Sequence, residues 1–208
     1  MVLYCKPRMK DIVTAEDVRE VPPGGEISAS PGAIVTAWAR EVAASRGVRI
    51  VHAAPAETSL TIAVGSDHGG LELKEQVKAH LTRLGYRFHD FGTYSPEPVD
   101  YPDIALAVAK AVQAGDARIG ILVDGAGIGS AMAANKVPGV RAALCVDAAA
   151  ARNAREHNDA NVLTLGARFV DATRMREIVE TFLASACTEE RHVRRVKKIK
   201  AIEETYCK

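Results

Sequence analysis

The sequence predicts a doubly wound α/β fold, a three-layer sandwich around a five-stranded, mostly parallel sheet, with a small N-terminal extension. From about residue 60 onward, short apolar runs alternate with segments of helical periodicity. Two of these runs end in polar, glycine-rich turns. Continuous apolar strands separated by helices are typical of a parallel sheet that is covered on both faces.

The expected elements follow from the position of each run. The strands are expected at residues 61–66, 86–92, 118–124, 141–146 and 161–167. The helices are expected at residues 71–84, 103–114, 131–136, 148–157 and 172–185, followed by a basic helix at 188–204.

Residues 1–56 form the expected extension, and residues 60–202 the main domain. Thr14 and Asp17 fit a capping box that starts a short helix. Ser30-Pro31 is predicted to cap and open a second helix, which Gly47 ends. In that helix one face would carry Ile34, Trp38 and Val42, and the sequence continues with a strand at 48–53 and a linker at 53–59.

Composition excludes several classes of protein. The net charge is +1 and 48% of the residues are apolar, which favours a well-packed globular protein over a nucleic-acid or membrane binder. No segment is long and apolar enough to span a bilayer. The four cysteines, Cys5, Cys145, Cys187 and Cys207, have no paired short spacing. This argues against a zinc site or disulfide framework and indicates a reducing, cytoplasmic location.

Asp67 and His68 follow the first strand of the main domain and precede two glycines. The carboxyl ends of parallel strands are where open α/β sheets bind ligands, and glycines allow a ligand to approach the backbone. The pair is therefore a candidate site. In the alternative interpretation, Asp67 only caps the following helix and His68 is solvated.

A second glycine-rich turn, from Gly125 to Gly129, follows the strand at 118–124. Its backbone amides could bind an anion or a developing oxyanion. The spacing fits neither a dinucleotide fingerprint nor a phosphate loop. Asp124, which ends the strand, could act as a general base or simply cap the amides of the loop.

Two basic features remain. His157 and Asn158 close a helix, where the helix dipole favours a protonated histidine that could act as an acid. The alternative is a C-cap with Asn158 in the left-handed conformation. On the last helix, Arg191, Arg195 and Lys198 share one face and could grip a phosphate, or form a solvated face opposite an apolar stripe of Val193, Val196, Ile199 and Ile202.

Taken together, these motifs resemble the type B ribose-5-phosphate isomerase family, which includes the galactose-6-phosphate isomerase subunits. The resemblance covers residues 60–202 and rests on GSDHGG, DYPD, GIGSAMAANKVPGVRAAL, AREHNDANVLTLGAR and RHVRRVKKI. It implies a Rossmann-like fold, a phosphorylated sugar substrate, no cofactor and no metal. It also implies a homodimer or homotetramer in which each site is built from two subunits.

The resemblance also implies roles for the matched residues. Asp67 and His68 would contact sugar hydroxyls, and the loop Gly125, Ala126, Gly127, Ile128 and Gly129 would steady an enediolate. His157, beside Asn158, would be the acid that opens the sugar ring. Arg168, Arg191 and Arg195 would bind the phosphate.

The chain departs from the family pattern at the base. Many members carry a cysteine where this chain has Asp124, and others carry a glutamate at the position of Ser130; Ala126 replaces a common Thr or Ser. We therefore expect Asp124 to act as a substitute base in a ribose 5-phosphate isomerase, with Ser130 as a further catalytic candidate. A carboxylate is already ionised at neutral pH, unlike a thiol, and burial can strengthen it as a base. The alternatives are an isomerase of another sugar phosphate and a non-catalytic sugar-phosphate-binding subunit.

The extension is faintly similar to segments joined to enzymes of bacterial microcompartments. This similarity implies targeting or assembly, shell proteins as partners, and a location inside a microcompartment within the cytoplasm. The alternative is a helical extension that packs on the main domain and shapes the oligomer.

Overall fold

The computed structural model describes residues 10–52 and 58–206, and the chain divides into two compact units, Met1–Glu57 and Thr58–Lys208. The first unit contains β1 (Lys10–Val13), α1 (Ala15–Glu20), β2 (Glu26–Val35), α2 (Ala37–Arg46) and β3 (Arg49–His52). Its three strands pair in parallel in the order β1-β2-β3. Val13, Val18, Ile27 and Ala39 are among the residues of its buried core.

The first unit confirms part of the sequence analysis and corrects one helix. The capping box is present: Thr14 N donates to Asp17 Oδ2 at 2.7 Å, and Asp17 N donates to Thr14 Oγ1 at 3.4 Å. Gly47 ends α2 with φ 66°. The predicted start of that helix at Ser30-Pro31 is wrong, because these residues lie within β2 and Thr36 caps α2.

The face predicted for this helix is correct only at Val42, which packs against the buried core of the unit. Ile34 belongs to β2 rather than to the helix, and Trp38 is exposed. Ala39 and Ala43 are the residues of α2 that are buried. The strand predicted at 48–53 is present as β3, whereas most of the predicted linker lies outside the described residues.

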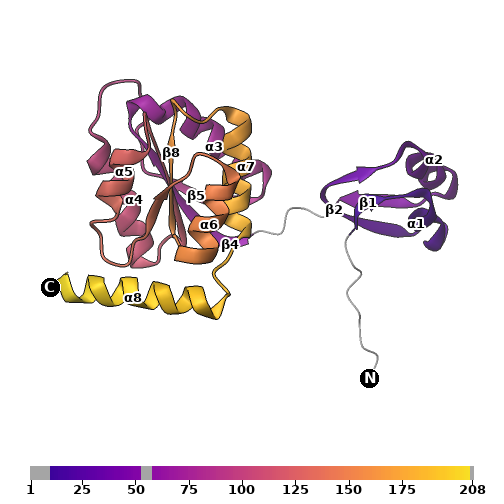
Figure 1. Ribbon diagram of the computed structural model, residues 1–208. Coiled ribbons are helices and arrows are strands. Elements are labelled where there is room, and N and C mark those ends of the chain that lie inside the picture. Colours follow the sequence, from indigo (N-terminus) through magenta and orange to yellow (C-terminus); the bar gives the residue numbers. More distant parts are fainter. Residues whose placement is uncertain (1–9, 53–57, 207–208) are drawn as a thin grey trace. The chain divides into compact units, whose positions relative to one another are not determined.

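The second unit has the predicted doubly wound architecture (Figure 1). Its strands are β4 (Thr58–Ser66), β5 (Tyr86–Asp90), β6 (Ile119–Asp124), β7 (Ala142–Leu144) and β8 (Val162–Gly166). Its helices are η1 (His68–Gly70), α3 (Leu71–Arg83), α4 (Tyr101–Ala114), α5 (Ile128–Ala134), α6 (Ala148–Asn158), α7 (Ala172–Ala184) and α8 (Glu190–Tyr206).

All four strand pairings in this sheet are parallel, in the order β5-β4-β6-β8-β7. Helices α3, α6 and α7 pack on one face, where Leu81 and Phe182 are fully buried. Helices α4 and α5 pack on the other face, where Val108 and Ala134 are fully buried. The chain leaves β4 toward β5 and returns to β6 on the other side, so the carboxyl ends of β4 and β6 form the switch point where such sheets bind ligands.

Helix α8 lies across one end of this sheet (Figure 1). Gly139 N, just before β7, donates to Glu203 Oε1 on α8 at 2.9 Å. Since Gly139 precedes its strand, α8 covers the amino end of the sheet, opposite the switch point.

Candidate active site

The first group of predicted residues lies at the carboxyl end of β4. Asp67 accepts the Gly70 amide through Oδ1 at 2.9 Å and so caps the short helix η1, as one of the two interpretations expected. The Val99 amide donates to His68 Nδ1 at 3.3 Å, which leaves Nε2 of this exposed ring for a ligand. Burial raises the pKa of Asp67; the Gly70 amide opposes this, and the charge of Asp124 adds to the increase.

Asp124 lies next to this pair, at the end of β6, and is only 4% exposed. Its Oδ1 accepts the amides of Ala126, at 2.7 Å, and Gly127. Its Oδ2 accepts the amide of Ser130 at 3.0 Å. The carboxylate therefore caps the inner side of the glycine loop. In contrast, the amides of Gly125, Ile128 and Gly129 donate to no acceptor among the described residues and stay available to an anion.

Two further side chains border the loop. Arg168 N donates to the Gly125 carbonyl at 3.1 Å, and its guanidinium packs on Gly125, since a Cβ there would lie 3.6 Å from Arg168 Nε. Tyr101, for which the sequence analysis assigned no role, lies against Gly129: a Cβ on that glycine would lie 2.5 Å from Tyr101 Cζ. Its position in the DYPD motif was the available signal.

The second group of predicted residues lies on α6. His157 is in the last turn of the helix, and Asn153 Nδ2 lies 3.1 Å from His157 Nδ1. The predicted left-handed cap at Asn158 is wrong, because the residue with φ 48° is Asp159. Arg141 Nε, just before β7, donates to the Asn158 carbonyl at 3.2 Å, so this end of α6 lies at the amino end of the sheet.

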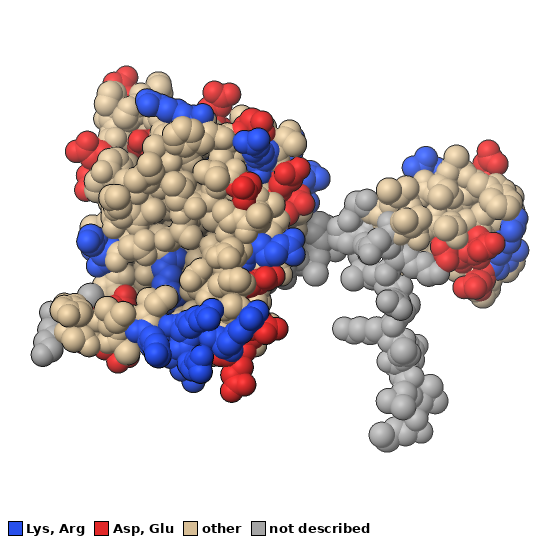
Figure 2. Space-filling model, in the orientation of Figure 1, with Lys and Arg blue, Asp and Glu red and all other residues tan. Residues whose placement is uncertain are grey.

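The arginines of α8 belong to this second group. Lys and Arg side chains gather over α8 (Figure 2), and Arg191 and Arg195 are both exposed there. Between them in sequence, His192 is 3% exposed and stacks on His157, with the ring centroids 3.9 Å apart and the planes at 11°. Burial lowers the pKa of His192, and His157 and the two arginines lower it further. The sequence analysis missed His192, although it lies within the quoted RHVRRV.

The structure thus brings the predicted residues together as two separate groups. The carboxyl-end group lies where β4 and β6 end and consists of Asp67, His68, Asp124, Ser130, the loop Gly125–Gly129 and Arg168. The amino-end group lies at the opposite end of the sheet and consists of His157, Asn158, Arg191 and Arg195. Because β6 has six residues at about 3.3 Å each, roughly 20 Å separates the two ends. A ligand much smaller than this distance cannot contact both groups of one chain at the same time.

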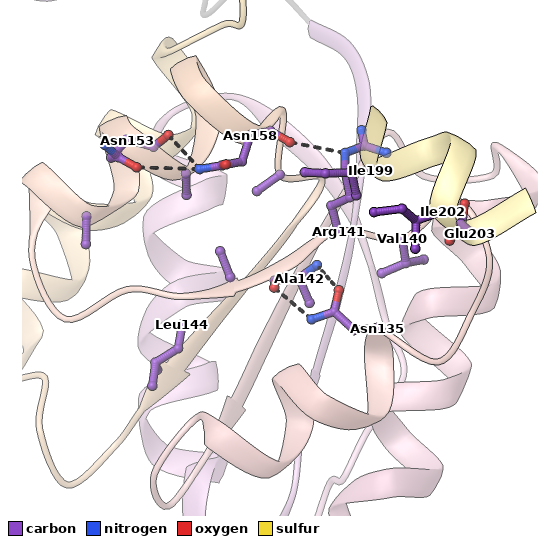
Figure 3. Close-up of a pocket in the computed structure, with 14 residues that line it drawn as sticks. Asn135, Val140, Arg141, Ala142, Leu144, Asn153, Asn158, Ile199, Ile202 and Glu203 are labelled. Carbon is purple, nitrogen blue, oxygen red and sulfur yellow. Dashed lines mark hydrogen bonds between the residues drawn. The ribbon is translucent and has the colours of Figure 1, made fainter. Parts of the chain in front are cut away.

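A groove of about 680 Å³ runs along the edge strand β7, from Ile199 and Ile202 of α8 to Leu144 (Figure 3). Leu144, Val140 and the α8 residues Ile199 and Ile202 supply apolar side chains to it. Asn135 bonds both the amide and the carbonyl of Ala142, at 2.8 and 2.9 Å, and so blocks part of the free edge of β7.

Three further features of the described residues concern a reactive cysteine, a metal site and a membrane-spanning helix. Burial raises the pKa of the Cys145 thiol to about 12, so this cysteine does not supply the missing thiolate. Among the described residues, no three His, Cys, Asp or Glu side chains are arranged to hold a metal ion. No helix in this part of the chain is sufficiently long and apolar to cross a membrane.

Comparison with known proteins places this arrangement in a family. Residues 62–199 match the model of the family described as Ribose/Galactose Isomerase. Ribose-5-phosphate isomerase B of Escherichia coli is 43% identical over 143 residues, which are 69% of this chain and 96% of that protein.

Solved structures agree with this match. Ribose-5-phosphate isomerase B of Clostridium thermocellum superimposes with a TM-score of 0.69 at 48% identity, covering 71% of this chain and 99% of that one. The Mycoplasma genitalium enzyme, solved with bound ribulose 5-phosphate, gives a TM-score of 0.67 at 42% identity, covering 71% and 98%. This chain therefore belongs to the Ribose/Galactose Isomerase family.

Proposed function

We propose that this chain is an aldose–ketose isomerase that interconverts ribose 5-phosphate and ribulose 5-phosphate through an enediolate, without a metal or cofactor. One observation carries the proposal. Two carboxylates, an exposed imidazole and three backbone amides without acceptors among the described residues lie together around the glycine loop, at the carboxyl ends of β4 and β6. Isomerisation needs these groups: a base for the C2 proton and donors for the oxygens that become charged.

The base is a carboxylate in this proposal, because the thiol common in the family is absent. The sequence predicted Asp124 for this role, and that prediction has not been tested. Its three amide contacts favour the alternative of capping the loop, which leaves Asp67 as a second carboxylate at the same edge. Ser130 contributes its amide to this network, and no direct part in proton transfer is required of it.

We further propose that a second copy of the chain completes each site, in a homodimer or homotetramer. Two observations support a second copy. The carboxyl-end group is far from the group at the amino end, which consists of His157, Asn158, Arg191 and Arg195, and an apolar groove lies beside α8. In the assembly, His157 of one copy would protonate the ring oxygen of a sugar bound at the loop of the other, while the arginines bind its phosphate.

The test is turnover of ribose 5-phosphate by the purified chain, followed by appearance of ribulose 5-phosphate and, in deuterated water, by NMR loss of the C2 proton. We expect both. Turnover of galactose 6-phosphate but not of ribose 5-phosphate would favour the alternative substrate. Binding of sugar phosphates with no proton exchange would leave the non-catalytic subunit as the function.

For the N-terminal unit we propose targeting or assembly, with shell proteins of a bacterial microcompartment as partners and the cytoplasm as the location of the whole particle. Support comes from its separate compact fold with its own core. A chain lacking residues 1–57 should keep its isomerase activity and oligomer size but lose co-localisation with shell proteins. A change of oligomer size instead would favour the assembly role on the enzyme itself.

A further inference from the structure

The contacts of Asp124 limit what it can do as a base. A base that takes a proton from carbon must present an unshared lone pair to the substrate at hydrogen-bond distance. A carboxylate has about four such positions. Three loop amides already occupy three of them, and the side chain is 4% exposed. If Asp124 turned toward a substrate, it would leave buried amides without acceptors, which is unfavourable.

Asp67 has the opposite environment. It is half-buried at the mouth of β4, and its Oδ1 is held by the Gly70 amide at 2.9 Å. A Cβ built on Gly69 would lie 3.4 Å from Asp67 Oδ1 and 3.7 Å from Gly125 N. The carboxylate and the first uncommitted amide of the loop therefore lie on the same side of Gly69, which has no side chain to separate them. A sugar bound over Gly69 could exchange a carbon-bound proton with Asp67 while its neighbouring oxygen accepts the Gly125 amide.

We propose that Asp67 is the catalytic residue that moves the proton between C2 and C1, and that Asp124 is a positioning residue that holds the loop. This assignment rests on the proposed isomerase function and deepens it. It gives the two carboxylates different tasks, which their different environments favour.

The proton transfer balances without any other reactant. With the sugar ring open, the Asp67 carboxylate takes the proton of C2, and the electrons of that C–H bond form the C1=C2 double bond. The C1 oxygen becomes the enediolate oxyanion beside the amides of Gly125, Ile128 and Gly129. The proton of the C2 hydroxyl moves to the C1 oxygen, Asp67 returns its proton to C1, and the C2 oxygen becomes the ketone.

Electrostatics agree with this assignment. The titratable groups that act on Asp67 are Asp124 on β6 and His68 on η1, and the Arg168 guanidinium packs on Gly125 in the neighbouring loop. Burial is the largest effect and raises the pKa of Asp67; the Gly70 amide opposes it, Asp124 adds to the increase, and His68 and the Gly69 amide lower the pKa, with a net increase. The result is a stronger base than an ordinary aspartate.

The experiment compares Asp67→Asn and Asp124→Asn, with Asp116→Asn as the matched control. Asp116 is an exposed carboxylate just before β6, at the opposite end of the same strand. The readouts are kcat, KM and the exchange of the C2 proton of ribose 5-phosphate in deuterated water. Folding of each variant is checked by circular dichroism.

We expect Asp67→Asn to lower kcat and proton exchange by at least about 100-fold with KM within about threefold, because the amide cannot accept the proton. The acidic limb of the pH profile should disappear with it, and Asp67→Glu should restore part of the rate. Asp124→Asn should lower kcat less than about tenfold, keep the acidic limb and reduce thermal stability. Asp116→Asn should behave as the parent.

Loss of proton exchange in Asp124→Asn, with exchange retained in Asp67→Asn, would overturn the assignment and restore Asp124 as the base. A different result would contradict the proposed function itself: if the unmodified chain exchanges no proton with any aldose phosphate, it is not an isomerase, and the comparison of the two variants does not arise.

Discussion

Gly127 is the residue on which the geometry of the glycine loop depends most directly. Its φ is 74°, and a Cβ would lie 2.5 Å from Leu144 Cδ1 and 2.8 Å from the carbonyl carbon of Leu165. Gly127→Ala should therefore cost about 2–5 kcal/mol in the free energy of unfolding, from backbone strain and overpacking together. Urea unfolding measures this. Gly115→Ala is the control: its φ is 82° with no atom within 4 Å, so it should cost only about 1–2 kcal/mol. Equal costs would show that packing around the loop is not tight.

Asp67 should show a trade-off between activity and stability. The pKa of its folded-state carboxyl lies above the ordinary value of 3.8, chiefly through burial. Its effect on stability is therefore most favourable below pH 3.8 and is lost as the pH rises through the folded-state pKa. Asp67→Asn should raise the melting temperature at pH 7, with the gain disappearing below pH 3.8. A lower melting temperature at pH 7 would mean that the carboxylate stabilises the fold.

The sequence predicted which residues lie at the carboxyl end of the sheet but not which contacts they make. Asp67, Asp124 and the glycine loop were all predictable, because strand ends and glycine turns are local patterns. Whether Asp124 faces a ligand or its own loop was left open. The answer depends on whether three amides bend back onto one carboxylate, which no spacing of residue types encodes.

At the scale of elements, Lys74 ties α3 to the segment after β5. It is 0% exposed, and its Nζ donates to Asp90 Oδ1 at 2.8 Å and to the Thr93 carbonyl at 2.7 Å. Lys74→Met would leave Asp90 without its buried partner, so we expect a loss of about 3–5 kcal/mol in the free energy of unfolding. Lys78→Met is the control, since Lys78 also contacts Asp90, at 2.6 Å, but its side chain is 21% exposed. It should cost about 1 kcal/mol or less. Similar losses in both variants would contradict a special role for the buried amine.

The error at β2 shows where local signals fail. Ser30-Pro31 has the composition of a helix start, yet β2 continues through it. The register jumps from Lys10↔Ala29 to Ile12↔Ile34, so the segment around Pro31 forms an irregularity between β1 and β2. Such irregularities accommodate a proline that lacks the amide for a regular ladder. Pairing with β1 is a tertiary contact, so the sequence window around Ser30 could not reveal it.

At the scale of the whole molecule, the sequence predicted every element of the sheet but not the separation of the predicted site into two ends. One signal was available. A helix that follows a parallel strand runs back along the sheet, so His157, in the last turn of α6, must return to the amino end. The position of α8 carried no such signal, because α8 follows helix α7 rather than a strand.

This separation predicts complementation between two inactive chains. Asp67→Asn disables the carboxyl-end group, and His157→Asn disables the amino-end group; each protein alone should be nearly inactive. If a site combines the ends of two copies, a mixed dimer holds one site with both changes and one site with neither. Random mixing of equal amounts, after reversible dissociation, should then restore roughly a quarter of the parent activity, since half the dimers are mixed and half their sites are intact.

The matched control for this experiment keeps both changes at one end of the sheet. Asp67→Asn mixed with Asp67→Ala, both at the carboxyl end, should restore nothing, because both loops of every mixed dimer lack the Asp67 carboxylate. Restoration in the control would point to refolding or exchange artefacts. No restoration in the first mixture, with mixed dimers demonstrated by mass, would mean that each chain builds its site alone, and the second-copy proposal would then be abandoned.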